Sequence, residues 1–110
     1  MNLLFVCSKN RKRSPTAEAV FSGREGIDVI GAGIDPDSPT PLTGDLIEWA
    51  EVVLVMETAH RRRLMTKFAP LLQSKRLVVL GIPDNYEFMD SRLVELLKRK
   101  LQSILKLQSS

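Results

Sequence analysis

The sequence of 110 residues contains few of the residues that build disulfides, metal sites and aromatic platforms: one cysteine, one histidine and 5% aromatic residues. A single cysteine, Cys7, cannot form an internal disulfide, which is typical of the reducing cytoplasm, where we expect the protein to act. Cys7 and His60 match no spacing of metal ligands, so the sequence predicts no metal site and no cofactor. The segment GAG (31–33) lacks the third glycine of a dinucleotide-binding fingerprint.

Long hydrophobic runs are also missing. Segments such as VVLVM (52–56) and LVVL (77–80) are far shorter than the roughly 18 residues that span a bilayer. No charged region precedes LLFV (3–6), so we expect neither a signal peptide nor a membrane partner.

The rest of the composition is ordinary for a globular protein, with 44% hydrophobic and 26% charged residues. The length fits one domain, which we place at residues 1–110, and we expect a monomer. A formal net charge of +3 and a pI near 9.3 favour anionic partners. Nucleic acid is disfavoured because few aromatic side chains are available to stack on bases.

Short apolar runs alternate with helical patterns along the chain. Four runs are continuously apolar, as strands buried on both faces of a parallel sheet are, at residues 3–6, 29–31, 52–56 and 77–80. Helical spacing of apolar residues follows each run, in segments that begin at Ser14 and that cover 42–50, 59–68 and 91–107. Ser14 is the expected N-cap of the first helix, and Asp90 or Ser91 that of the last. This order predicts an α/β fold: a single open parallel four-stranded sheet flanked by helices.

The stretch VCSKNRKRSPTAE (6–18) carries the most specific chemical signal. Cys7 lies at the carboxyl end of the first predicted strand, and the first helix follows at about Ser14. In such a loop, successive backbone N–H groups turn inward and, with the helix N-terminus, bind an anion of phosphate size. Cysteines in these surroundings are commonly thiolates at neutral pH and act as nucleophiles. Arg13 adds a planar fork that matches two phosphoryl oxygens.

The same stretch resembles the signature of the low-molecular-weight protein tyrosine phosphatases, V-C-x-G-N-x-C-R-S-P-x-A-E. The residues that match are Val6, Cys7, Asn10, Arg13, Ser14, Pro15, Ala17 and Glu18. The resemblance continues more weakly in GAG (31–33) and EVVLVME (51–57). It implies a short, divergent member of the family, with the phosphate-binding loop between the first strand and the first helix.

The resemblance also implies roles for individual residues. Cys7 is expected to form a cysteinyl-phosphate, and Arg13 to hold the phosphoryl group. Asn10 is expected to fix the loop backbone, and Ser14 to donate its hydroxyl to the thiolate. The implied phosphate-binding residues are Ser8, Lys9, Asn10, Arg11, Lys12, Arg13 and Ser14.

The family carries a general-acid aspartate in the loop after the last strand, here GIPDNYEFMD (81–90). Proton donation to the leaving group contributes about 10²–10⁴ in rate. Asp84 and Asp90 compete for the role, and we favour Asp84 because Asp90 sits where a helix cap belongs. Tyr86 falls where the family places an aromatic wall beside the substrate ring.

Three loop positions depart from the family pattern. Lys9 replaces a glycine, Arg11 a branched aliphatic residue that gates the substrate ring, and Lys12 a second cysteine. The rim of the site is therefore basic and should attract anionic substrates, an effect that salt weakens. His60 and the arginines at 61–63 could form a second basic patch, although arginine runs on helices are usually solvated.

The sequence thus predicts a phosphatase that hydrolyses phosphomonoesters, with protein phosphotyrosine first, through a cysteinyl-phosphate and an aspartate general acid. Its partner is a phosphorylated protein or a small anionic phosphomonoester, and a phosphoarginine phosphatase is the alternative. An arsenate reductase of this fold needs further cysteines, and a phosphocarrier does not need Arg13 and Asp84. From another class, a basic anion- or nucleic-acid-binding domain without catalysis explains the charge but not the Cys-x5-Arg pattern.

Overall fold

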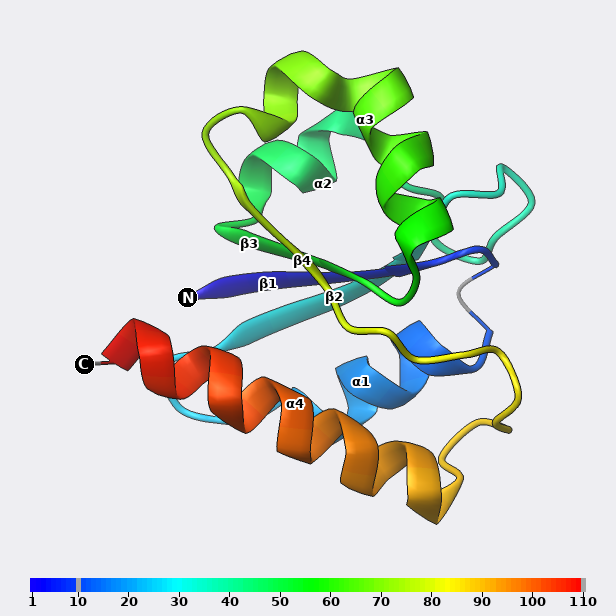
Figure 1. The fold of residues 1–110 in the computed structure, drawn as a ribbon, viewed down its shortest axis with the longest axis vertical. Coiled ribbons are helices and arrows are strands. Elements are labelled where there is room, and N and C mark those ends of the chain that lie inside the picture. Colours follow the sequence, from blue (N-terminus) through cyan, green and yellow to red (C-terminus); the bar gives the residue numbers. More distant parts are fainter. Residues whose placement is uncertain (10, 110) are drawn as a thin grey trace.

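Four parallel strands form one sheet in the order β2-β1-β3-β4 (Figure 1). The computed structural model describes residues 1–9 and 11–109, with side chains up to residue 104. The strands are β1 (Asn2–Cys7), β2 (Asp28–Gly33), β3 (Val52–Val55) and β4 (Arg76–Val79). In the central register, Leu3 pairs with Val29 of β2 and with Val52 of β3. The predicted α/β fold with one open parallel sheet is confirmed.

A helix follows each strand, and each of the first three helices returns the chain to the start of the next strand. The helices are α1 (Arg13–Phe21), α2 (Gly44–Trp49), α3 (Thr58–Leu72) and α4 (Ser91–Ser109). Figure 1 shows α1 and α4 on one face of the sheet and α2 and α3 on the other. Alternate β1 side chains serve both cores: Leu3 and Phe5 pack on the α1–α4 side, and Leu4 and Val6 on the α2–α3 side. Burial on both faces explains the continuously apolar sequence of β1.

Two helices differ from their predicted bounds. Helix α1 begins at Arg13 with Lys12 as its N-cap residue, so the predicted cap at Ser14 is wrong. Ser14 lies instead within the first turn, and its side chain is buried. Helix α3 continues through Pro70 to Leu72, because non-helical angles at Phe68 (φ −127°) form a kink that accommodates the proline.

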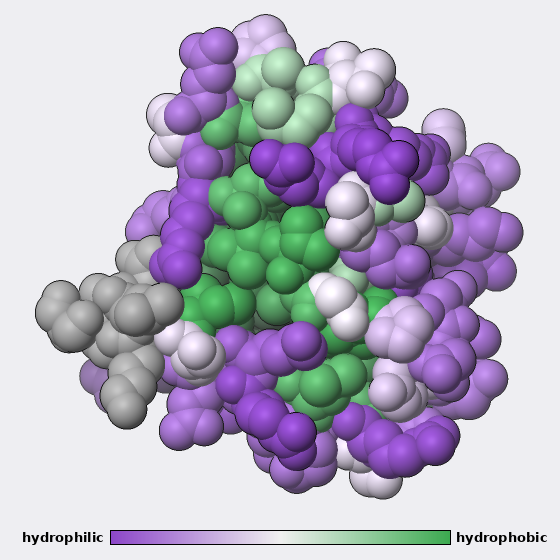
Figure 2. Space-filling model, in the orientation of Figure 1, coloured by the Kyte–Doolittle hydropathy of each residue, from purple (hydrophilic) through white to green (hydrophobic). Residues whose placement is uncertain are grey.

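The strand β4 forms one edge of the sheet, and Val79 within it is 36% exposed. Figure 2 shows apolar surface over this edge, between the hydrophilic surfaces of α3 and α4. Within the part of the chain that the structure describes, no helix is long and apolar enough to cross a bilayer.

The direction of the connections reverses beside β1. The chain passes from β1 to β2 on one side, and then from β2 to β3 on the other side of β1. At such a switch point the carboxyl ends of the strands leave a crevice in which ligands bind. Cys7 is the last residue of β1 and lies at this point.

Candidate active site

The segment between β1 and α1 borders a pocket of about 430 Å³. Cys7 and Arg13, at its two ends, are each only 3% exposed, whereas the basic side chains between them are exposed. The described lining consists of Cys7, Ser8, Lys9, Arg11, Lys12, Arg13 and Asp84. The structure therefore brings together the predicted nucleophile, arginine and acid. Asn10 lies outside the described residues, and its role in the loop stays a prediction.

The segment after β2 supports the beginning of this loop. The N–H of Ile34 donates to the carbonyl of Cys7 at 2.9 Å, and the N–H of Asp35 donates to that of Ser8 at 2.8 Å. Gly33 permits this close approach: a Cβ there would lie 2.1 Å from Ser38 Oγ and 2.9 Å from the carbonyl carbon of Lys9. Any side chain at position 33 would push the loop or the Ser38 turn away.

The guanidinium of Arg13 is fixed by groups from two later parts of the chain. Nη1 donates to the carboxylate of Glu57 and, at 2.8 Å, to the carbonyl oxygen of Ile82. Nε lies 3.8 Å from Oδ1 of Asp84. Both hydrogen bonds use Nη1, so Nε and Nη2, with the Asp84 carboxylate beside Nε, form the edge whose geometry matches the paired oxygens of a phosphoryl group.

Two residues at the start of α3 support the site and were not among the predicted site residues. Glu57 is the N-cap of α3 and forms a reciprocal capping box with His60. The Nδ1 atom of His60 accepts the N–H of Glu57 at 3.1 Å, which leaves the proton of the neutral ring on Nε2. Nε2 then donates to Ser8 Oγ at 3.0 Å. The start of α3 thus contacts both ends of the loop between β1 and α1, through His60 at Ser8 and through Glu57 at Arg13.

His60 is 3% exposed, unlike the neighbouring arginines, so the expectation of a solvated helix face holds only for residues 61–63. Burial lowers the pKa of His60 below its usual value, and the positive charges of Arg13 and Arg63 lower it further. The carboxylates of Glu57 and Asp84 act in the opposite direction but do not reverse the shift. His60 is therefore neutral near pH 7, as its hydrogen bonds require.

Ser14 Oγ is buried and has no hydrogen-bond partner among the described residues. Leaving a buried hydroxyl unsatisfied costs about 1–3 kcal/mol, and such groups are rare enough to call for an explanation. Donation to a Cys7 thiolate would satisfy this hydroxyl; that role stays a prediction.

The loop between β4 and α4 is tied to α1. Thr16 Oγ1 accepts the N–H of Met89 at 2.9 Å, and Lys12 Nζ lies 3.5 Å from Glu87 Oε1. Asp84, with a 63% exposed side chain, lines the pocket. Asp90 precedes α4, where its carboxylate accepts the N–H of Arg92 at 2.9 Å, as a helix cap does.

Tyr86 lies outside the described lining of the catalytic pocket. Its ring lies 5.6 Å from the Arg92 guanidinium, and both side chains line a neighbouring groove along α4. Tyr86 also packs against the α1–α4 core. Its role as a wall beside a substrate ring stays a prediction, which requires the tyrosine to reach the pocket when substrate binds.

Comparison with known proteins shows what this chain is similar to. No protein-family model matches the chain. The protein-arginine-phosphatase of Bacillus subtilis (strain 168) is 30% identical, in an alignment that covers 62% of this chain and 63% of that protein. The chain thus aligns with less than two thirds of this curated relative's length. A solved low-molecular-weight protein tyrosine phosphatase from Bacillus subtilis is 27% identical over 100% of both chains, with a TM-score of 0.74. These similarities, all at low identity, are to members of the low-molecular-weight protein tyrosine phosphatase family, as expected of a divergent relative.

Other solved structures show the same similarity. A YwlE mutant from Bacillus subtilis is 27% identical, with a TM-score of 0.71 and coverage of 96% of this chain and 99% of that one. The tyrosine phosphatase Wzb from Escherichia coli K30, solved in complex with phosphate, has the same fold at 17% identity, with a TM-score of 0.71 and 96% coverage of both chains. The family resemblance inferred from residues 6–18 is thus confirmed.

Proposed function

We propose that this chain is a phosphatase that removes phosphate from protein phosphotyrosine through a cysteinyl-phosphate intermediate. The observation that carries the proposal is the convergence of Cys7, Arg13 and Asp84 on one pocket at the switch point of the sheet. Similarity to relatives described as phosphatases supports it.

In the first step, the Cys7 sulfur attacks phosphorus in line with the leaving oxygen. A sulfur–phosphorus bond forms as the phosphorus–oxygen bond breaks, and Asp84 transfers its proton to the departing phenolate. The Nε and Nη2 edge of Arg13 holds two equatorial phosphoryl oxygens. Glu57 and Ile82 keep that edge in place by holding Nη1.

In the second step, water attacks the phosphorus of the cysteinyl-phosphate, and Asp84, now a carboxylate, accepts a proton from that water. The sulfur–phosphorus bond breaks, and inorganic phosphate leaves. The exposed position of Asp84 at the pocket gives water access to this step.

The basic rim favours phosphotyrosine among protein substrates. The guanidinium of Arg11 at this rim is suited to stack on an aromatic ring such as that of phosphotyrosine. Phosphoarginine is the second candidate substrate, because the curated relative described above is a protein-arginine-phosphatase.

Initial rates on matched phosphotyrosine, phosphoserine and phosphoarginine peptides test the proposal. We expect the phosphotyrosine peptide to be hydrolysed fastest and Cys7→Ser to hydrolyse none. If the phosphoarginine peptide is hydrolysed faster than the phosphotyrosine peptide, phosphoarginine becomes the proposed substrate. Hydrolysis that persists in Cys7→Ser would refute the cysteinyl-phosphate. Absence of any hydrolysis, together with tight binding of random-sequence RNA, would favour a binding domain without catalysis.

A further inference from the structure

A further groove, of about 440 Å³, lies between α3 and the loop after β2. We call it the α3 groove. Its lining joins an apolar floor to three cations and consists of Ile34, Pro36, Arg62, Arg63, Thr66 and Lys67. None of these residues takes part in the catalytic steps proposed above.

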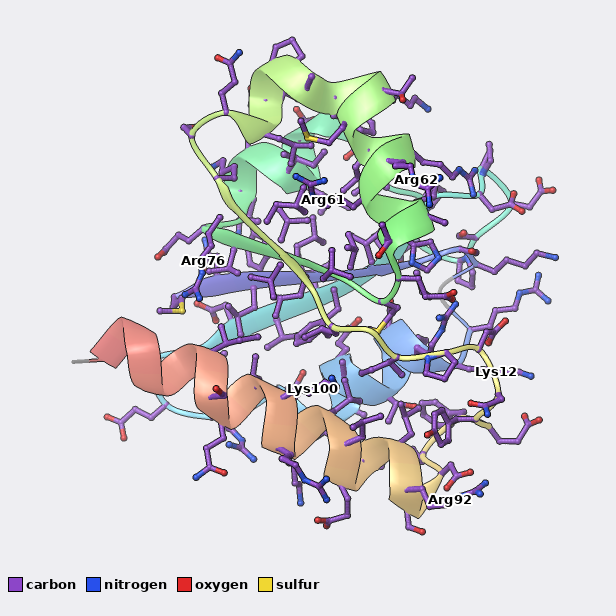
Figure 3. All side chains as sticks on the ribbon, viewed as in Figure 1. Lys12, Arg61, Arg62, Arg76, Arg92 and Lys100 are labelled. Carbon is purple, nitrogen blue, oxygen red and sulfur yellow. The ribbon has the colours of Figure 1, made fainter. Side chains whose placement is uncertain are left out.

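The α3 groove carries an excess of positive charge. Arg62, Arg63 and Lys67 are exposed, and none pairs with a carboxylate among the described residues. Asp35, from the adjoining loop, instead accepts the N–H of Asp37 at 3.0 Å and so stabilises its own turn. Figure 3 shows Arg61 and Arg62 on different sides of α3, and of these two only Arg62 lines the groove. In Figure 2, hydrophilic residues cover the right-hand side of the view, next to α3.

The α3 groove is next to the catalytic loop. Ile34, in the groove, donates its N–H to the carbonyl of Cys7 at 2.9 Å. Arg63 lies one helical turn from His60, which contacts Ser8 at 3.0 Å. An extended peptide advances about 3.3 Å per residue, so a short substrate segment that leaves the pocket on this side can run towards the groove.

We propose that the α3 groove binds an acidic segment of the protein substrate that flanks its phosphorylated residue. This proposal rests on the proposed function. The cations of Arg62, Arg63 and Lys67 pair with Asp or Glu carboxylates, and Ile34 and Pro36 contact the aliphatic parts of the segment. The described lining contains no aromatic side chain on which a base could stack, so the groove favours a polypeptide over single-stranded nucleic acid.

The first test measures binding without catalysis. A fluorescein-labelled, unphosphorylated peptide with a glutamate-rich segment is titrated with the protein at low ionic strength, beside the same peptide with glutamines. We expect Arg62→Gln/Lys67→Gln to weaken binding of the acidic peptide by roughly threefold to tenfold, because exposed ion pairs contribute little individually. The control, Arg61→Gln/Lys98→Gln, removes the same charge from exposed positions outside the groove lining. Equal affinities for the two double variants would overturn the proposal.

The second test compares kcat/KM for two phosphotyrosine peptides, one with acidic and one with neutral flanks. We expect the wild-type preference for acidic flanks to fall towards one in Arg62→Gln/Lys67→Gln and to persist in the control variant. If neither the wild type nor any variant hydrolyses either peptide, the proposed function is contradicted. The binding titration then still tests whether the α3 groove binds the acidic peptide. If random-sequence RNA binds more tightly than the acidic peptide and the groove variant loses that binding, the proposal of a peptide site is wrong.

Discussion

Replacing Glu57 by glutamine tests whether the site depends on the anchoring of Arg13. The substitution removes the negative charge from the carboxylate that accepts from Arg13 Nη1, and it keeps the size of the side chain. Arg13 then keeps the carbonyl of Ile82 and the more distant carboxylate of Asp84 as partners. The positive charge of the guanidinium then lacks its nearest carboxylate at a position that water hardly reaches.

The expected loss follows from the burial of the two partners. Breaking a fully buried ion pair costs about 3–5 kcal/mol, and an exposed pair contributes about 0.2–1 kcal/mol. The Arg13 side chain is 3% exposed but that of Glu57 is 42% exposed, so this pair lies between the two limits. Because the glutamine amide oxygen still accepts a hydrogen bond, we expect the free energy of unfolding to fall by about 1–2 kcal/mol. A guanidinium displaced by about 1 Å also lowers kcat/KM, by roughly 10²-fold.

Urea unfolding and aryl phosphate hydrolysis measure the two effects. The matched control is Glu51→Gln, at an exposed residue with no side-chain ion pair among the described residues. We expect the control to match the wild type in the urea midpoint and in kcat/KM. If Glu57→Gln also matches the wild type in both quantities, Glu57 does not position Arg13 and the reasoning is refuted.

Three further substitutions test other parts of the site. Gly33→Ala places a Cβ 2.1 Å from Ser38 Oγ, so we expect the free energy of unfolding to fall by about 1–3 kcal/mol and kcat/KM to fall as well. Adding Ser38→Gly should partly restore both quantities. A single variant as stable as the wild type would contradict the close approach. The pKa of His60 is lowered in the folded state, so the unfolded state binds its proton first as the pH falls below about 6.5, and stability drops by at most about 1.4 kcal/mol per pH unit. His60→Gln should remove this part of the pH dependence of urea unfolding between pH 7 and 5. A pH profile identical to that of the wild type would show that His60 does not titrate as described. Asp84→Asn should lower kcat on alkyl phosphates by about 10²–10⁴, with a smaller effect on p-nitrophenyl phosphate. Asp90→Asn should keep the wild-type rate, and the reverse pattern would assign the proton donor to Asp90.

The fold could be predicted because its signals are local. The continuously apolar runs identify all four strands to within a few residues, and the pattern around Cys7 and Arg13 places the anion-binding loop after the first strand. The start of the first helix differs from the prediction because a serine before a proline is typical of an N-cap, whereas Ser14 lies buried within the first turn.

The supports of the site could not be predicted in the same way. Glu57 is 44 residues from Arg13 in sequence, and His60 is 52 residues from Ser8, so no local pattern relates them. One signal was available: Glu57 follows the third strand closely, and the carboxyl ends of parallel neighbours meet at one edge of the sheet. The strand order that makes β1 and β3 neighbours is what turns this signal into a contact.

The long separation between Arg13 and its two anchors also sets an order of assembly during synthesis. Glu57 and Ile82 follow Arg13 by 44 and 69 residues. At about 5–20 residues per second, a ribosome adds the second anchor roughly 3–14 seconds after the arginine. The arginine is therefore made first, Glu57 joins it part-way through that interval, and the pair of anchors is complete only with Ile82. Synthesis of the segment after β4, rather than of the loop itself, sets the earliest time at which the guanidinium is fully held.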